Sequence, residues 1–440
     1  MKLEDKIKLA EFILENCKKN GATEASATIY DGVESEYEQR EYKLDKLSQA
    51  KTKGAKIEIY CGKKYAAAFT NDLREKTLLS FVKDTINVAK YLEEDEFRGL
   101  PDPKYYPKDT NVDLLIYDDN FSKIASEKKI KLVEELENLA NKDDERIISV
   151  NSTYSDNEYE EYRATTNGFS ASRKSSFYSI SVEVACKDFK GGKPSGYSYA
   201  SSRKFNELPD LRILAEQAYK KAVGKIGQEK INSGKYLTVV ENRVGARLLN
   251  MIISPLFASN VQQKRSIFAD KLNQKILSDK LTIYDDPHIP AGIGSRLYDS
   301  YGIESKKMVL FEKGVLKNFY VDVYYGRKLG MEPNSASPSN IVLEYGEKNL
   351  NEIIKSIDRG IFIDNFIGGN FNTLTGDFSF GISGYLIENG ELTKPINEMN
   401  ITGNVIELFK NIVEVGADPY LYSSYRIPTI VYNDVDFSGL

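Results

Sequence analysis

The single histidine of this 440-residue chain, His288, limits the chemistry that the sequence can support. It lies in the segment YDDPHIPAGIGS, closely preceded by Asp285 and Asp286. One interpretation makes Asp285, Asp286 and His288 an acid–base group in a loop, which would suit a metal-independent hydrolase. The other makes the segment a rigid connection between Pro287 and Pro290, whose polar side chains bind backbone amides, because a lone histidine is more often structural.

The histidine count also restricts metal chemistry. A catalytic zinc site needs about three protein ligands from histidine, cysteine or carboxylate side chains, so one histidine excludes any two-histidine site within one chain. The three cysteines, Cys17, Cys61 and Cys186, are scattered and form no C-x-x-C pair. We therefore expect buried thiols in a reducing compartment, no disulfide, no metal and no cofactor.

A second stretch that could carry function is GGNFNTLTGDFSFGISGYLIENG, residues 368–390. Its aromatic residues alternate with small or polar ones, which indicates a strand with one apolar face. Such a glycine-rich approach lets an extended peptide lie close to the backbone, as in strand addition, but it is also typical of a corner in a bent β domain. The candidate contact residues in it have short polar side chains: Asn370, Asn372, Thr373, Thr375 and Asp377.

The composition excludes several classes of protein. The 60 basic and 65 acidic residues give a net charge of −5 and are interspersed along the chain, which disfavours direct binding of nucleic acid. No apolar run is long enough to cross a membrane, and the first 21 residues read as a charged amphipathic helix rather than a secretory signal. We therefore expect a cytoplasmic protein without membrane contact.

The first half of the chain predicts an α+β domain over residues 1–233 that contains an internal duplication. The first unit, about residues 1–98, predicts a helix, strands at 24–30, 34–42, 56–61 and 65–70, and a second helix. The second unit, about residues 112–225, predicts a helix, strands at 146–154, 158–165, 177–185 and 196–201, and a final helix. Two related α-β-β-β-β-α units are therefore expected, joined by a proline-containing linker at 99–111.

The second half predicts a β-rich antiparallel domain over residues 234–440, a barrel or a sandwich. Turns at 312–314 and at Asn389-Gly390 indicate two hairpins. Helices are expected around residues 244–253 and 404–416, the latter beginning at Asn404 with Glu407 in a capping-box arrangement. The fold class predicted for the whole chain is α+β.

Residues 356–418 resemble the C-terminal core of the TldD/PmbA family, bacterial and archaeal cytosolic proteins once called modulators of DNA gyrase. The resemblance extends to residues 54–73, 281–303 and 314–331. It implies an α+β N-terminal region, a β-rich C-terminal domain, and dimers with a cleft for extended peptides.

The family contains two branches, and the resemblance places this chain in the PmbA/TldE-like one. TldD-type subunits look like zinc peptidases with an H-E-x-x-x-H motif on a helix and a later cysteine ligand. Here Leu249 and Ser254 stand where the two imidazoles belong, Asn250 stands where the glutamate belongs, and no cysteine follows Cys186. No catalytic residue and no metal ligand of the family can therefore be carried over to this chain.

These observations predict a metal-free subunit, inactive alone, of a TldD/TldE-type metallopeptidase system that acts on unfolded or extended peptides. It would form a homodimer or a heterodimer with a TldD-like zinc peptidase. The residues of the 370–377 loop, together with Asp286 and His288, are the candidate cleft or partner contacts. Two alternatives stay open: the hydrolase based on Asp285, Asp286 and His288, and a non-enzymatic peptide-binding or regulatory protein linked to DNA gyrase.

Overall fold

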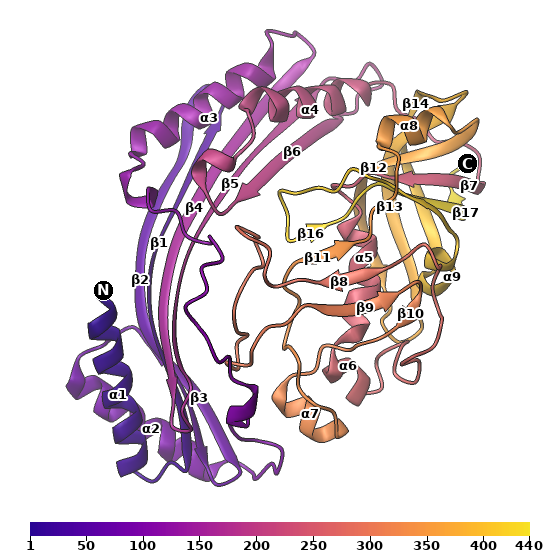
Figure 1. The fold of residues 1–440 in the computed structure, drawn as a ribbon. Helices are drawn as coiled ribbons and strands as arrows, with labels where there is room; N and C mark the ends of the chain where they lie inside the picture. The colour runs from indigo at the N-terminus through magenta and orange to yellow at the C-terminus, as the bar shows by residue number, and fades with distance from the viewer.

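The N-terminal half contains two units with the same order of elements. The structure, a computed structural model, describes residues 1–440 (Figure 1). The first unit consists of α1 (Leu3–Lys19), β1 (Glu24–Arg40), β2 (Lys43–Cys61), β3 (Lys64–Thr70) and α2 (Glu75–Tyr91). The second consists of α3 (Ser126–Asn141), β4 (Ile147–Thr165), β5 (Ser170–Cys186), β6 (Ser195–Ser202) and α4 (Leu211–Gly224).

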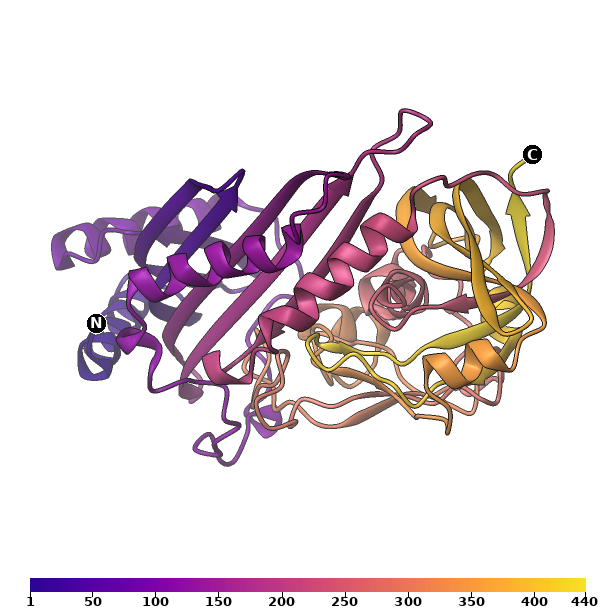
Figure 2. The same ribbon diagram turned by 90° about the horizontal axis from the view of Figure 1, so that it is seen from above.

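The six strands form one antiparallel sheet in the order β3-β2-β1-β4-β5-β6, with the two units joined by the β1–β4 pair. All four helices lie on the convex face of this curved sheet, and the C-terminal half lies on its concave side (Figures 1 and 2). Separate apolar clusters under α1 and α2 and under α3 and α4 give each unit its own core. The predicted α+β class is confirmed.

The number of strands in each unit differs from the prediction, because two pairs of expected strands are single long strands. The strands expected at 24–30 and 34–42 merge into β1, which ends at Arg40. Those expected at 146–154 and 158–165 merge into β4, which begins at Ile147. The apparent breaks contain Asp31 and Asp156, which resemble turn residues. Instead, Lys6 Nζ lies 2.5 Å from Asp31 Oδ1 and Lys129 Nζ lies 2.6 Å from Asp156 Oδ2. Each carboxylate is thus neutralised within a continuous strand.

The connection between the units, residues 92–125, runs over the concave side of the sheet and is fastened to α7 (Val323–Leu329) of the C-terminal half. Arg327 Nη2 donates to the carbonyl of Leu100 at 2.5 Å, and Tyr324 OH donates to Asp95 Oδ2 at 2.6 Å. These contacts hold the far end of the sheet against the C-terminal half.

The C-terminal half is dominated by strands. Besides α7, its helices are α5 (Ala246–Ile253), α6 (Ala258–Gln262), α8 (Leu350–Lys355) and α9 (Val405–Lys410). Its larger sheet contains β7 (Gly234–Val240), β12 (Arg359–Phe371), β13 (Asp377–Glu388), β14 (Glu391–Asn404), β15 (Ile412–Val415) and β17 (Ile430–Ser438). Its smaller sheet contains β8 (Ile283–Asp285), β9 (Met308–Glu312), β10 (Val315–Leu316), β11 (Ile341–Leu343) and β16 (Tyr425–Arg426).

The larger sheet closes on itself, because β14 pairs with β17 as well as with β13. A cluster of 40 buried apolar residues joins this barrel to the smaller sheet and to α5. The predicted hairpin turn between β13 and β14 is confirmed, with positive φ angles of 52° at Asn389 and 79° at Gly390. The half is mostly antiparallel, as expected, although β12 pairs with β7 and β11 with β16 in parallel.

The predicted helix over 404–416 is wrong in its second half. The helix α9 ends at Lys410, and Ile412 and Val415 then enter β15, where they are buried beside β17. The side chain of Asn404 accepts from the backbone N–H of Ile406 and begins the helix without the expected contact to Glu407. Burial of β-branched side chains against a strand therefore overrides the helical spacing.

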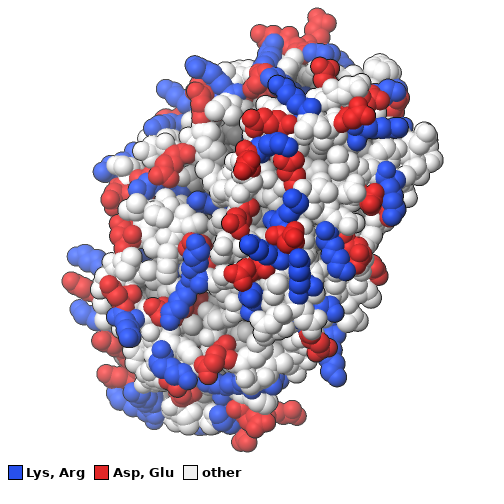
Figure 3. Space-filling model, turned by 45° about the vertical axis from the view of Figure 1, so that its right-hand side comes forward, with Lys and Arg blue, Asp and Glu red and all other residues white.

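None of the helices combines the length and the apolar composition that a membrane span requires. On the face shown in Figure 3, lysine and arginine side chains alternate with aspartate and glutamate side chains over short distances. That face therefore presents no continuous surface of one charge.

Candidate functional site

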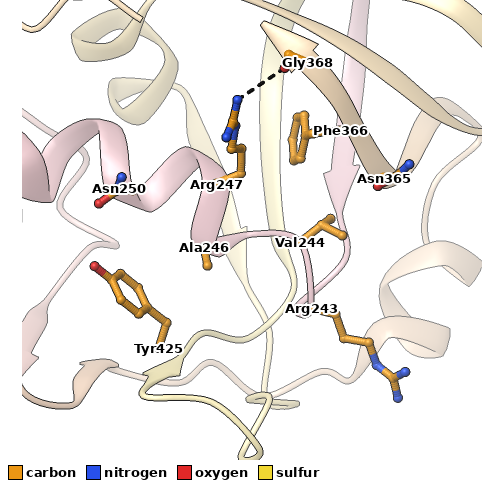
Figure 4. Close-up of a pocket in the computed structure, with 9 residues that line it drawn as sticks. All are labelled: Arg243, Val244, Ala246, Arg247, Asn250, Asn365, Phe366, Gly368 and Tyr425. Carbon is orange, nitrogen blue, oxygen red and sulfur yellow. Dashed lines mark hydrogen bonds between the residues drawn. The ribbon is translucent and has the colours of Figure 1, made fainter. Parts of the chain in front are cut away.

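A cavity of about 670 Å³ lies between the beginning of α5 and the outer half of β12. Figure 4 shows α5 on one side of it, with Arg247 and Asn250, and Phe366 of β12 on the other. Tyr425 of β16 closes a third side, and Arg243, just before α5, lies at the end of the cavity. The cavity therefore combines residues from three segments that are far apart in the sequence.

The path of the chain after β7 explains why this cavity exists. The parallel pairing of β7 with β12 covers only Ile361, Ile363 and the residue between them. The N–H of Glu241 makes a last bond to the carbonyl of Ile363 at 3.0 Å, and the chain then turns away into α5. From Asn365 onward β12 pairs only with β13. One edge of β12 is therefore left without a neighbouring strand where it passes the cavity.

The amphipathic pattern of α5 orients its side chains. Leu248, Leu249 and Ile252 are buried in the barrel core, whereas Arg247 and Asn250 lie on the opposite face and line the cavity. This separation follows from the spacing of apolar residues in a helix that packs on one side only.

The three positions aligned with the zinc motif are not brought together at the cavity. Asn250 lines it, but the side chain of Leu249 is fully buried in the apolar core. Ser254 lies at the end of α5, where its carbonyl accepts from Asn260 Nδ2 at 2.8 Å. No three histidine, cysteine, aspartate or glutamate side chains converge anywhere in the structure. These residues therefore do not fit the zinc ion of the TldD-type branch.

A second cavity, of about 280 Å³, adjoins the first and lies between the two halves of the molecule. Both cavities share Arg243, Val244 and Asn365. The second is lined by Tyr197 and Tyr199 of β6, and burial raises the pKa of the Tyr199 hydroxyl. The two cavities form one continuous depression that runs from the N-terminal sheet to α5.

Ion pairs hold the two halves together beside this second cavity. Lys221 of α4 lies 2.5 Å from Glu241, and Lys225, next to α4, lies 3.3 Å from Asp364 of β12. Tyr420 OH also donates to the carbonyl of Tyr199. Because the partners come from opposite halves, these contacts fix the relative positions of the two cavity walls.

The loop that carries the predicted contact residues forms a compact turn between β12 and β13. Asn372 Oδ1 accepts from the backbone N–H groups of Leu374 at 2.9 Å and Thr375 at 3.3 Å. Asn404 Nδ2 donates to the carbonyl of Thr375 at 2.8 Å and to Asp377 Oδ1 at 3.2 Å. The hydrogen bonds from Asn404 and from Thr375 also lower the pKa of the Asp377 carboxyl, which is exposed.

This loop lies apart from the two cavities. None of its five candidate residues lines either of them, although Gly368 near the same end of β12 does. Asn370, Asn372, Thr375 and Asp377 are exposed, and Thr373 is half-buried with its carbonyl bound to the N–H of Ile267 at 3.0 Å. The loop therefore presents a defined polar turn on the surface of the molecule.

The structure separates the residues of the predicted acid–base group. His288 is exposed, and its backbone N–H donates to Asp286 Oδ1 at 3.1 Å. Its imidazole makes no hydrogen bond to either aspartate. Asp286 Oδ2 pairs with Lys307 at 3.2 Å. The carboxylates bind backbone amides, as the structural interpretation expected, whereas the imidazole that it also assigned to this role makes no such bond.

Asp285 belongs to a buried polar network. Burial raises the pKa of its carboxyl, although hydrogen bonds from Ser339 and Tyr320 counteract the shift. Tyr320 OH donates to Asp285 Oδ2 at 2.8 Å and the N–H of Ser339 donates to Oδ1 at 3.0 Å. These bonds join β8 to neighbouring segments and hold Asp285 in the interior, where it is 3% exposed.

Arg243, Arg247 and Tyr425 line the cavity but were not predicted from the sequence. The two arginines flank the start of α5 in the segment RVGAR, and their spacing of four residues before an apolar helix is the signal that could have drawn attention to them. Tyr425 comes from a strand about 180 residues later, so no local pattern connects it to α5.

Comparison with known proteins places this arrangement in a family. The family model "PmbA/TldA metallopeptidase C-terminal domain" matches residues 233–439, and "PmbA/TldA metallopeptidase central domain" matches residues 119–226. The chain belongs to the TldD/PmbA family of metallopeptidases and their homologues, as the resemblance predicted.

Three relatives illustrate the similarity. A protein of Bacteroides thetaiotaomicron, named as a candidate modulator of DNA gyrase, has a crystal structure with a TM-score of 0.97, 40% identity and complete coverage of both chains. The metalloprotease PmbA homologue of Haemophilus influenzae is 27% identical over 87% of this chain and 85% of its own. TldE from Thermococcus kodakarensis has the same fold, with a TM-score of 0.88 at 20% identity over 98% of this chain and all of its own.

Proposed function

We propose that this chain is a subunit without a zinc site of its own, which pairs with a TldD-type zinc peptidase and helps to hold extended peptides for cleavage. The observation that carries the proposal is the composition of α5. Leu249, Asn250 and Ser254 occupy the positions where the family resemblance places two zinc ligands and a general base, and these residue types do not form a zinc site.

The cavity beside α5 supports a role in holding peptide. It is large enough for several side chains, at about 670 Å³, and it lies next to the unpaired edge of β12. An extended peptide can add to such an edge through main-chain hydrogen bonds, which give affinity with little dependence on sequence. A peptidase system that degrades unfolded chains must bind peptides of many different sequences.

The turn at residues 370–377 supports a role in assembly. Its tip exposes Leu374, with 55% of its surface accessible, next to the exposed polar residue Thr375. Its shape is held by backbone bonds to the side chains of Asn372 and Asn404. We propose that this turn contacts the other subunit, which is either a second copy of this chain or the zinc peptidase.

Co-purification from the native host, followed by a peptide-cleavage assay, tests the proposal. The assembly with a TldD-type subunit is expected to cleave an unfolded peptide and to lose activity with a chelator. The isolated chain is expected to be inactive and to contain no zinc. Stoichiometric zinc in the isolated chain, or chelator-resistant cleavage by it, would contradict the proposal.

A substitution in the turn separates assembly from folding. Thr375→Arg places a long charged side chain at the proposed contact and is expected to weaken assembly or the activity of the partner, while the isolated chain stays folded. Thr375→Ser is the matched control, because it keeps the hydroxyl that accepts from the N–H of Asp377. Equal subunit affinity for both variants would show that the turn does not contact the partner.

A further inference from the structure

The two arginines of the cavity beside α5 have no acidic partner in the structure. Arg247 Nη2 donates to the carbonyl of Gly368 at 3.3 Å, and its guanidinium lies 4.9 Å from the ring centre of Phe380. Arg243 Nη1 donates to Ser198 Oγ at 3.1 Å. Neither guanidinium forms an ion pair, and no acidic residue lines this cavity. Its wall therefore carries two positive charges that the chain does not neutralise.

The second cavity provides the contrast within the same depression. Its two lysines, Lys221 and Lys225, are both paired with carboxylates, Glu241 and Asp364. Their positive charge is largely compensated. Arg247 of α5 thus lies beside β12 with no carboxylate in the cavity lining. The guanidinium of Arg243 reaches Ser198 of β6 at the second cavity, which Glu183 also lines.

Neutral hydrogen-bonding groups accompany the arginines. The side chains of Asn250, Asn365 and Tyr425 line the cavity and make no hydrogen bond within the chain. In Figure 4, Asn250 and Tyr425 lie at one end of the cavity, whereas Arg247 reaches toward Gly368 at another. Amide N–H₂ and phenol O–H groups donate to anions as guanidinium groups do. The cavity therefore offers several donors and no competing carboxylate.

We propose that this cavity is a carboxylate-binding subsite for an extended peptide lying along the free edge of β12. The proposal rests on the proposed function and adds a substrate class to it: peptides with a carboxylate within reach of Arg247 or Arg243. Charge-assisted hydrogen bonds to guanidinium are the strongest polar contacts that a peptide can make here. The carboxylate is the C-terminal group of the peptide or an acidic side chain.

Direct binding measurements with four peptides test the subsite. The chain contains no tryptophan, so the emission of a single tryptophan in a short uncharged peptide reports binding without a background from protein indole. One pair of peptides carries a C-terminal acid or amide, and a second, amidated pair carries an internal Glu or Gln. We expect at least one acidic member to bind about tenfold more tightly than its neutral partner.

Variants connect this preference to the arginines. Arg243→Ala combined with Arg247→Ala is expected to abolish the difference between acidic and neutral peptides. Arg247→Glu is expected to reverse it. Arg40→Ala is the matched control, since Arg40 is an exposed arginine at the end of β1 that lines neither cavity. Circular dichroism checks that each variant is folded.

The outcomes separate the subsite from the proposed function. Equal binding of acidic and neutral peptides, a preference that survives the double substitution, or no binding of any peptide would overturn the subsite. None of these results depends on whether the chain raises the activity of a zinc peptidase. If the chain fails to support cleavage but prefers acidic peptides through the arginines, the proposed function is wrong and the subsite stands.

Discussion

Lys6 and Lys129 occupy equivalent positions in the two units of the N-terminal sheet. Lys6 Nζ lies 2.5 Å from Asp31 of β1 and 3.1 Å from Glu160 of β4, which are opposite each other in the β1–β4 register. Lys6 itself is fully buried. A helix on each unit thus inserts one ammonium group at the junction of the two central strands.

The second unit repeats this contact with one difference. Lys129 Nζ lies 2.6 Å from Asp156 of β4 and 3.1 Å from Ser35 Oγ of β1, and this pair is also directly opposite in the register. Ser35 stands where the first unit has a glutamate. The two units therefore share a buried ion pair between a helix and the central strands.

Substituting the two lysines by methionine is expected to destabilise the fold unequally. Lys129→Met leaves Asp156 buried without its counter-ion, which costs about 3–5 kcal/mol. Lys6→Met is expected to cost less, about 1–2 kcal/mol, because its carboxylates Asp31 and Glu160 keep 25% and 23% of their side-chain surface exposed. Urea unfolding measures both free energies.

The exposed Lys131 of α3 provides the control for this pair. Lys131→Met removes the same charge without breaking an ion pair and is expected to change the unfolding free energy by less than about 0.5 kcal/mol. If Lys6→Met lowers the free energy of unfolding more than Lys129→Met does, burial of the carboxylate partners does not determine which substitution is more destabilising.

Protonation of Asp118 is expected to destabilise the fold at acid pH. Burial raises the pKa of its carboxyl, but hydrogen bonds, chiefly from the N–H groups of Phe205 and Asn120, lower it below the ordinary value. Because the folded-state pKa is depressed, this carboxylate stabilises the fold above the unfolded pKa of about 4. That contribution is lost as pH falls below about 4 through the folded pKa.

Urea midpoints at pH 6 and pH 3.5 test the role of Asp118. Between pH 6 and pH 3.5 we expect the urea midpoint of the wild type to fall further than that of Asp118→Asn. The midpoints of the two proteins should therefore approach each other at acid pH. The exposed Asp45→Asn serves as the control and should follow the wild type. A constant difference between wild type and Asp118→Asn would mean that protonation of Asp118 is not involved.

The thiols are expected to differ in reactivity. Burial, with a smaller effect of Cys61, raises the pKa of Cys17 to about 12, and Cys186 is also fully buried with a raised pKa. Cys61 is partly exposed. Since the thiolate is the reactive form, a chromogenic disulfide at pH 8 should titrate one thiol rapidly and two only after unfolding. Cys61→Ser should remove the rapid phase, and its persistence would identify a different exposed thiol.

Substitutions that introduce zinc-site residue types on the two faces of α5 are expected to change the free energy of unfolding by different amounts. Leu249→His buries an imidazole in the apolar core and should cost about 2–4 kcal/mol. Asn250→Glu faces the cavity and should change the unfolding free energy by less than about 0.5 kcal/mol. Thermal unfolding in the presence and absence of zinc compares them. Stabilisation of Leu249→His by zinc would contradict the position of residue 249 in the core.

The sequence predicted the hairpins and helices that depend on local signals. It predicted two short strands where the structure has one long strand, in β1 and again in β4. In β1, Asp31 and Gly32 resemble a turn. The structure requires both within the strand, because Asp31 binds Lys6 and a Cβ atom at position 32 would lie 2.7 Å from the carbonyl oxygen of Glu158. Contacts outside the segment, one of them to a residue more than a hundred positions away, therefore determine how it folds.

The site was predicted only in part for the same reason. The placement of a degenerate metal motif on α5 points to a helix that borders the cavity, and Asn250 lines it. The charge of the cavity comes from Arg243 and Arg247, and one wall comes from Tyr425. Only the exit of the chain from β7 and the closure of the barrel bring these groups to the same place.

The fastening of the linker to α7 has a consequence for synthesis on the ribosome. Arg327 binds the carbonyl of Leu100, a partner 227 residues earlier in the chain. Domains generally fold as they emerge, N-terminal regions first, so the sheet can form and bind the segment around Leu100, through Glu24 and Asn167, before α7 is made. The contacts to α7 are added only when that helix has left the exit tunnel, so the connection is fastened to the C-terminal half at a late stage of synthesis.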